Sequence, residues 1–158
     1  MEEDQWRPPI QMKEPLMLRG LTTVSFFADD VAAARDWYTD VLGTPPYFAR
    51  PDDGPPAYME FRLGDYEHEL GIIDSRFAPQ RRAEGQLGGA GGALIYWHVD
   101  NVTASFERLL SLGATVYEAP VERGPGFVTA SVADPFGNVL GVMYNQHYLD
   151  VLASRPGG

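Results

Sequence analysis

Two stretches of the chain share one pattern of hydrophobic and polar positions. Residues 21–43 and residues 94–116 each begin with an alternating apolar run, pass through acidic or amide residues, and continue with apolar positions at helical spacing. Alternation with a period of two is typical of a half-buried strand, and spacings of three and four are typical of an amphipathic helix. Each stretch therefore predicts a strand followed by a helix. A repeat of about 70 residues is too long for a solenoid and indicates a duplicated module.

Both expected helices carry start and stop signals. Asp29-Asp30 and Asp100-Asn101 precede the helical patterns, and their side-chain oxygens can accept hydrogen bonds from unpaired N–H groups of a first turn. Gly43 and Gly113 follow the last apolar positions, where glycine commonly ends a helix.

Each expected helix is followed by segments with strand character, separated by turn residues such as Gly64-Asp65 and the run from Asp134 to Gly137. These segments are residues 57–63 and 66–74 in the first half, and 114–122, 127–133 and 138–145 in the second. Both halves therefore predict a βαβββ module, which places the chain in the α+β class.

The remaining residues divide the chain. Prolines at positions 8, 9 and 15 oppose a regular helix near the N-terminus, and residues 75–93 are rich in glycine and arginine. The expected organisation is an N-terminal tail (1–20), a first module (21–74), a linker (75–93), a second module (94–148) and a C-terminal tail (149–158).

Strand alternation turns one set of side chains away from the helices. This set mixes aromatic rings, hydroxyl groups and a few charges, a composition typical of ligand pockets. We therefore predict that it lines a cup-shaped pocket for a small apolar or aromatic molecule, bound by stacking. The predicted pocket residues are Thr23, Ser25, Phe27, Tyr58, Glu60, Arg62, Tyr96, Phe127 and Thr129.

Composition narrows the function classes. The formal net charge of −10 disfavours nucleic acid as a partner, because an acidic surface repels phosphate. There is no cysteine, which excludes disulfides and thiolate metal sites. The acidic N-terminus does not resemble a secretory signal, and no apolar run approaches the ~18 residues of a membrane span. We expect a cytoplasmic protein with no membrane or nucleic-acid partner.

Several of these motifs together resemble the vicinal oxygen chelate superfamily, which includes glyoxalase I, bleomycin resistance proteins and extradiol dioxygenases. The resemblance rests on Trp37-Tyr38, Leu42-Gly43, Val99-Asp100 and the run Asp134-Pro135-Phe136-Gly137-Asn138. It implies that the paired modules form one concave, partly closed mixed sheet around a small molecule. It also implies a homodimer.

The resemblance also locates a metal site. In the metalloenzymes of the superfamily each module supplies two ligands, and these positions correspond to Thr23, Glu69, Leu94 and Gly141. Only Glu69 is a ligand of the usual type, whereas a catalytic divalent site usually needs three protein ligands. We therefore expect a metal-ligand-deficient subgroup with no cofactor. The alternative is a divalent metal at a non-family site, with Glu69 and His98 as ligands and Glu60 near.

Two residues are candidates for catalysis. His98 could act as a general base or donate a hydrogen bond to a ligand, and Glu69 could be a base in a desolvated pocket. The structural interpretation is that His98 fills the pocket floor while bonded to Glu69 or Tyr96, and that Glu69 forms an ion pair with Arg62 or a hydrogen bond to Tyr96. The leading hypothesis is metal-independent binding. The alternatives are a lyase, isomerase or dioxygenase using a relocated metal or a metal-free Glu/His site, and an interaction module without a pocket.

Overall fold

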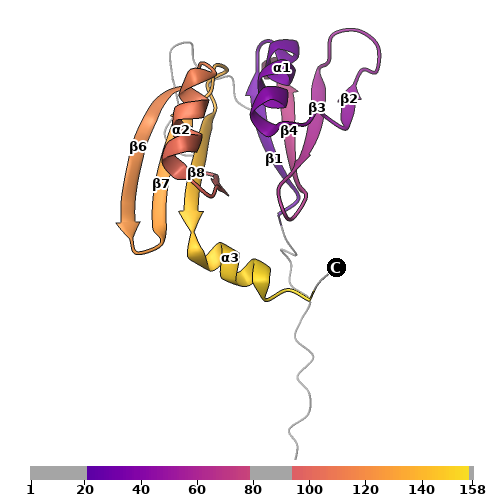
Figure 1. The fold of residues 1–158 in the computed structure, drawn as a ribbon. Coiled ribbons are helices and arrows are strands. Elements are labelled where there is room, and N and C mark those ends of the chain that lie inside the picture. The colour runs from indigo at the N-terminus through magenta and orange to yellow at the C-terminus, as the bar shows by residue number, and fades with distance from the viewer. Residues whose placement is uncertain (1–20, 79–93, 157–158) are drawn as a thin grey trace, which may run out of the picture.

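A computed structural model describes residues 21–78 and 94–156 (Figure 1). The expected tail over 1–20 and most of the expected linker, residues 79–93, lie outside the described residues. The first module consists of β1 (Thr23–Ala28), α1 (Val31–Leu42), β2 (Phe48–Arg50), β3 (Tyr58–Leu63) and β4 (His68–Asp74). A short 3₁₀ helix, η1 (Ser75–Phe77), follows it.

The second module repeats this order. It consists of β5 (Tyr96–His98), α2 (Val102–Ser111), β6 (Thr115–Gly124), β7 (Phe127–Ala133) and β8 (Val139–Asn145), and helix α3 (Gln146–Ala153) follows. No helix among the described residues is long and apolar enough to cross a membrane.

The eight strands of residues 21–78 and 94–156 form two four-stranded mixed sheets, in the orders β1-β4-β3-β2 and β5-β8-β7-β6. In each sheet the strand before the helix pairs in parallel with the last strand, and the other pairings are antiparallel. The α+β class and the paired βαβββ modules are confirmed. Within the described part of the chain the two sheets stay separate and are not closed.

The capping prediction is confirmed at both helices. Asp30 accepts a hydrogen bond from the backbone N–H of Ala33 at 2.9 Å, and Asn101 accepts one from Ala104 at 3.0 Å. Gly43 ends α1 with a φ of 70°, a left-handed conformation in which glycine has no steric penalty.

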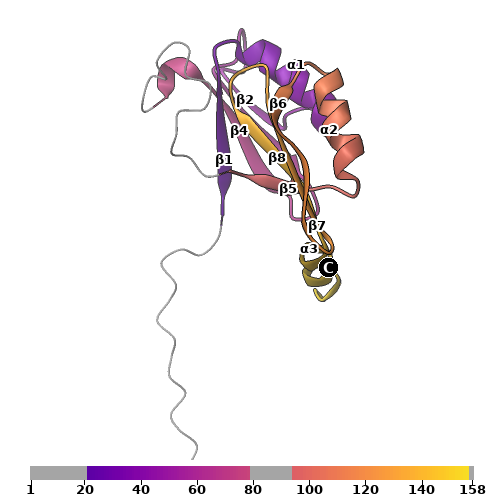
Figure 2. The same ribbon diagram turned by 90° about the vertical axis from the view of Figure 1, so that its left-hand side faces the viewer.

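The predicted division of strand faces is also confirmed. Met59 and Phe61 of β3 and Ala130 and Val132 of β7 are fully buried on the helix side of their sheets. Tyr38 of α1 is buried with them. Figure 2 shows α1 and α2 on the same side of the strands. Side chains that alternate along β3 with Met59 and Phe61 point to the opposite face of the sheet.

The turn between β7 and β8 joins the second module to the first. Its Asp134 accepts a hydrogen bond from the hydroxyl of Tyr38 at 2.6 Å. Its Asn138 accepts from the backbone N–H of Phe27 at 3.1 Å and donates to the Phe27 carbonyl at 2.9 Å. These polar groups are buried or half-buried, where hydrogen bonding offsets the cost of desolvation. The turn thus links β1 and α1 to β8.

Two elements differ from the sequence prediction. β2, which pairs with β3, is the strand of the first βαβββ module that has no location in the sequence prediction, and α3 covers residues 146–153 where the sequence predicts a tail from 149. Asn145 caps α3 by accepting from the backbone N–H of His147 at 3.0 Å. Figure 1 shows α3 running from the end of β8 toward the first module.

Candidate functional site

The strand face of the first module that turns away from α1 carries a polar row. Thr23, Glu69 and Arg62 lie beside one another on β1, β4 and β3. Thr23 Oγ1 donates to Glu69 Oε1 at 2.7 Å, and Arg62 Nη2 lies 3.6 Å from Glu69 Oε2. Both carboxylate oxygens of Glu69 therefore already have a partner. Arg62 is the ion-pair partner that the structural interpretation of Glu69 predicted.

A second carboxylate on this face is held by two tyrosines. The hydroxyl groups of Tyr47 and Tyr58 both donate to Glu60. Hydrogen bonding to the ionised form lowers the pKa of Glu60 below its ordinary value. The same hydrogen bond is the main cause that raises the pKa of Tyr47 to about 12. Glu60 therefore remains ionised and both phenols remain protonated at neutral pH.

Sequence reasoning did not include Tyr47. It precedes β2, and its backbone N–H donates to the Glu60 carbonyl at 3.0 Å, which continues the pairing of β2 with β3. The guanidinium of Arg62 lies 4.8 Å from the centre of the Tyr47 ring. Had β2 been located from the sequence, its pairing with β3 would have placed Tyr47 opposite Glu60.

Tyr58 owes its position to a glycine. A Cβ atom on Gly71 of β4 would lie 3.3 Å from the Tyr58 ring, so the ring occupies the space that a side chain would need. Burial, and then the hydrogen bond to Glu60, raise the pKa of Tyr58 above its ordinary value.

The second module repeats this arrangement more tightly. A Cβ on Gly141 of β8 would lie 2.6 Å from both the Ile95 carbonyl oxygen and Cδ1 of Tyr96. Real Cβ atoms do not approach backbone oxygen so closely, so no side chain fits at Gly141 unless β5 moves. Tyr96 and Tyr58 thus each lie against a glycine on the face away from the helices.

His98 is enclosed by α3 and β8. Its side chain is 8% exposed, and its ring stacks on Tyr148 with a centroid separation of 4.6 Å. Its Nδ1 accepts from the backbone N–H of Asn145 at 3.2 Å, which places the proton of the neutral ring on Nε2. Nε2 is buried without a hydrogen bond among the described residues, and Asp100 Oδ1 is 3.6 Å away. Among the described residues no hydrogen bond or ion pair joins His98 to Glu69.

The other predicted pocket residues differ in exposure. Ser25 is exposed, and Phe27 and Phe127 are half-buried at the ends of their strands. Thr129 is buried and accepts from Arg123 Nε at 3.1 Å. Arg123, which sequence reasoning did not include, also pairs with Glu118 on β6.

Comparison with known proteins identifies the family. The sequence profile of the glyoxalase/bleomycin resistance protein/dioxygenase superfamily matches residues 20–142 of the chain. The chain belongs to this superfamily. A comparison with curated proteins finds no match.

Several solved structures share the fold. A superfamily member from Sphaerobacter thermophilus is 17% identical with a TM-score of 0.61, over 81% of this chain and 98% of that one. A lactoylglutathione lyase from Agrobacterium tumefaciens is 21% identical with a TM-score of 0.58, over 82% and 96%. TioX from Micromonospora is 17% identical with a TM-score of 0.59, over 80% and 98%. At these identities the likeness shows the fold alone.

The metal site implied by the superfamily resemblance does not fit the residues present. Gly141 has no room for a side chain, and Leu94 offers no ligand atom. Glu69 is hydrogen-bonded to Thr23 and lies beside Arg62. Within residues 21–78 and 94–156, no group of three or more His, Cys, Asp or Glu side chains could hold a metal ion.

Proposed function

We propose that the protein binds a small apolar or aromatic molecule, without a metal, against the strand faces that turn away from the helices. The observation that carries this proposal is the pair of tyrosines fixed by Glu60. Tyr47 is 50% exposed, and its ring orientation is set by a hydrogen bond before any ligand arrives. Preorganised rings lose little conformational entropy when a flat ligand stacks on them.

The charges on this face support binding more than catalysis. A general base works best with a pKa near the operating pH, and the pKa of Glu60 is shifted the other way. Glu69 is occupied by Thr23 and Arg62. We therefore assign these carboxylates to holding the ring and hydroxyl groups in place. Thr23 and Arg62 are both exposed and supply polar contacts for a ligand.

The alternative, a metal-free enzyme, would need His98 to reach a substrate. Tyr148 stacks over the imidazole, and Nε2 is buried. This enclosure favours a structural role for His98, so binding remains the proposed function. The absence of cysteine supports a cytoplasmic location as part of the same proposal.

We also propose that the protein acts as a homodimer. β6 is an edge strand among the described residues, and its Val116 and Tyr117 are 57% and 55% accessible. An edge strand with exposed apolar side chains is suited to contact a second copy. Light scattering after size exclusion should give twice the chain mass of 17.5 kDa. A monomer at micromolar concentration would contradict this part of the proposal.

Equilibrium dialysis tests the binding proposal. Protein purified with a chelator is dialysed against a metabolite extract, and retained compounds are identified by mass spectrometry. We expect enrichment of an apolar or aromatic compound, with loss of enrichment in Tyr47→Ala and Tyr58→Ala. Phe77→Ala, which removes a ring that is 60% exposed on η1, is the matched control and should retain the compound. The proposal fails if nothing is enriched, or if both tyrosine variants retain the compound.

A further inference from the structure

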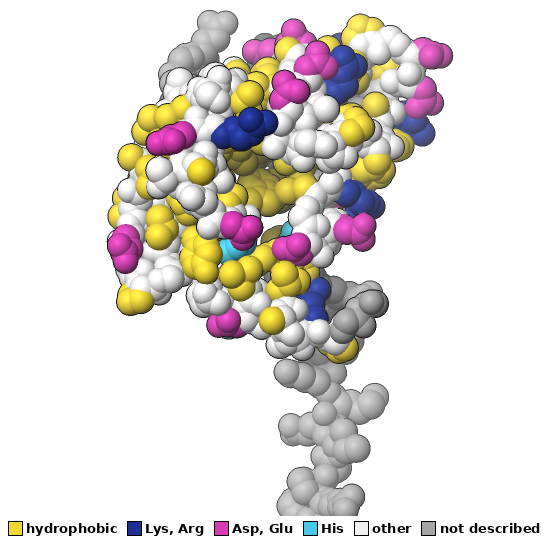
Figure 3. All heavy atoms as spheres, viewed as in Figure 1, with side chains coloured by type: hydrophobic (Ala, Val, Ile, Leu, Met, Phe, Trp, Pro, Cys, Tyr) yellow, Lys and Arg dark blue, Asp and Glu magenta, His cyan; other side chains and the backbone are white. Residues whose placement is uncertain are grey.

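A cavity of about 310 Å³ lies between the two modules on the helix side of the sheets. Leu42 and Leu63 of the first module and Trp97 and Leu140 of the second contribute to its largely apolar wall. Figure 3 shows this region as a hollow floored by hydrophobic side chains, with a basic side chain at its rim.

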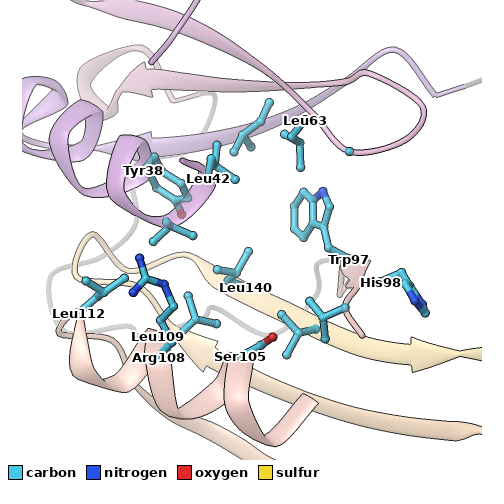
Figure 4. A pocket seen from close by; sticks show the side chains of 15 residues that line it. Tyr38, Leu42, Leu63, Trp97, His98, Ser105, Arg108, Leu109, Leu112 and Leu140 are labelled. Carbon is cyan, nitrogen blue, oxygen red and sulfur yellow. The ribbon is translucent and has the colours of Figure 1, made fainter. Parts of the chain in front are cut away.

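This cavity is not the site proposed above. Leu63, Trp97 and Leu140 point to the helix side of their strands, opposite to Tyr58 and Tyr96. Of the residues predicted for a site from the sequence, only His98 lines the cavity, and Figure 4 shows its ring directed away from the centre.

The cavity is large enough for a ligand. An apolar cavity of roughly 150 Å³ is known to hold benzene, and ordinary ligand pockets begin at about 300 Å³. The cavity of 310 Å³ has about twice the volume of the one that holds benzene, so it has room for a short hydrocarbon chain or a substituted ring.

One end of the cavity carries a positive charge. Arg108 of α2 donates from Nη2 to the backbone carbonyl of Asp40 at 3.3 Å, and no carboxylate lies within ion-pair distance of it among the described residues. A guanidinium group has five N–H donors, so most of them are free to bind an anion. Figure 4 shows Arg108 extending from α2 toward α1, with Leu140 between it and Trp97.

We propose that this cavity is a second ligand site, specific for a compact apolar monocarboxylate. The carboxylate pairs with Arg108, and the hydrocarbon body lies along Leu140 toward Trp97. Guanidinium and carboxylate groups match in shape and form two parallel hydrogen bonds. A single arginine balances a single negative charge, and the net charge of −10 disfavours ligands with two or more.

Titration calorimetry with octanoate and the neutral 1-octanol tests the proposal. We expect octanoate to bind the full chain one to one, with saturation below its micelle concentration. Arg108→Gln should lower the affinity for octanoate about tenfold or more, because a hydrogen bond between charged groups contributes at least a factor of ten to affinity. The affinity for 1-octanol should be unchanged. Arg35→Gln is the matched control, since Arg35 is a partly exposed arginine on α1 that pairs with Asp36. Its octanoate affinity should equal that of the wild type.

A second variant locates the hydrocarbon. Leu63→Phe adds volume at the half-buried end of β3 and should weaken octanoate and 1-octanol alike, with circular dichroism showing that the fold is kept. Three results would overturn the proposal: no saturable octanoate binding, equal octanoate affinity in Arg108→Gln, or equal affinity for both ligands in Leu63→Phe. None of these three results bears on the proposed strand-face site, which the dialysis experiment tests separately.

Discussion

At the residue scale, Gly141 links sequence to function most directly. The superfamily resemblance places a metal-binding glutamate here, and the structure shows a position closed by the Ile95 carbonyl and the Tyr96 ring. We expect Gly141→Ala to lower the free energy of unfolding by about 1–3 kcal/mol, as overpacking does. Gly71→Ala should cost less, because its Cβ would come no closer than 3.3 Å to any neighbouring atom, the nearest being in the Tyr58 ring. Urea unfolding followed by circular dichroism compares the two variants, and equal losses of unfolding free energy would contradict the tighter packing at Gly141.

The pKa of Glu60 provides a test of the tyrosine pair. Tyr47 and Tyr58 both donate to the ionised carboxylate and lower its pKa. Tyr58→Phe removes one donor, so the pKa of Glu60 should rise toward its ordinary value of 4.5. Carbon-detected NMR titration of the side-chain carboxyl measures this, with Tyr66→Phe as a control that leaves Glu60 unaffected. An unchanged pKa in Tyr58→Phe would show that the hydrogen bond is not formed in solution.

Alkaline pH should destabilise the fold through Tyr38 and Tyr148. Burial, and then Asp134, raise the pKa of Tyr38, while burial and the hydrogen bond to Asp65 raise the pKa of Tyr148 to about 12. The unfolded chain loses these protons near pH 10, before the folded chain does. The free energy of unfolding is therefore fully retained below about pH 10 and falls as pH rises toward 12.

Urea midpoints measured across this range check the prediction. Tyr148→Phe should flatten part of the decline, and Tyr117→Phe, at an exposed position on β6, should leave it as in the wild type. A decline of the same steepness in Tyr148→Phe would remove Tyr148 from this explanation.

At the element scale, α3 connects the modules through one tyrosine. Tyr148 donates to Asp65 in the β3–β4 turn at 2.8 Å and stacks on His98 of β5. We expect Tyr148→Ala to expose His98, so its modification by diethyl pyrocarbonate should become several times faster, as peptide mass spectrometry can measure. His147, already exposed, serves as the internal control. If His98 is modified equally fast in both proteins, α3 does not cover it in solution.

The sequence predicted the elements that have strong local signals. Asp30 and Asn101 indicate where α1 and α2 begin, because a helix cap needs a particular residue type. Alternation of apolar and polar residues indicates β3 and β7, because one face of each strand is buried. β2 spans only three residues and has a single neighbour, so it leaves almost no pattern. α3 does have a local signal, with Asn145 as its cap and Leu149 and Leu152 at helical spacing, and the prediction of a tail from residue 149 overlooked it.

At the scale of the whole molecule, the sequence predicted two modules and the polar strand faces, but not how side chains meet across them. The Glu69 and Arg62 pair could be anticipated from strand parity. Tyr47 could not, because it reaches Glu60 only through the pairing of β2 with β3. The cavity near Arg108 could not be predicted either, because helices and strands of both modules contribute to its walls, and no local sequence pattern relates these elements.

The proposed function requires that the strand faces bind their ligand without a metal. The most direct measurement is calorimetric titration of the compound enriched by dialysis, once with EDTA present and once with added zinc or iron. We predict the same affinity in both, because Gly141 excludes a ligand side chain and Glu69 is engaged by Thr23 and Arg62. Affinity that is lost in EDTA and restored by a stoichiometric metal would contradict the claim.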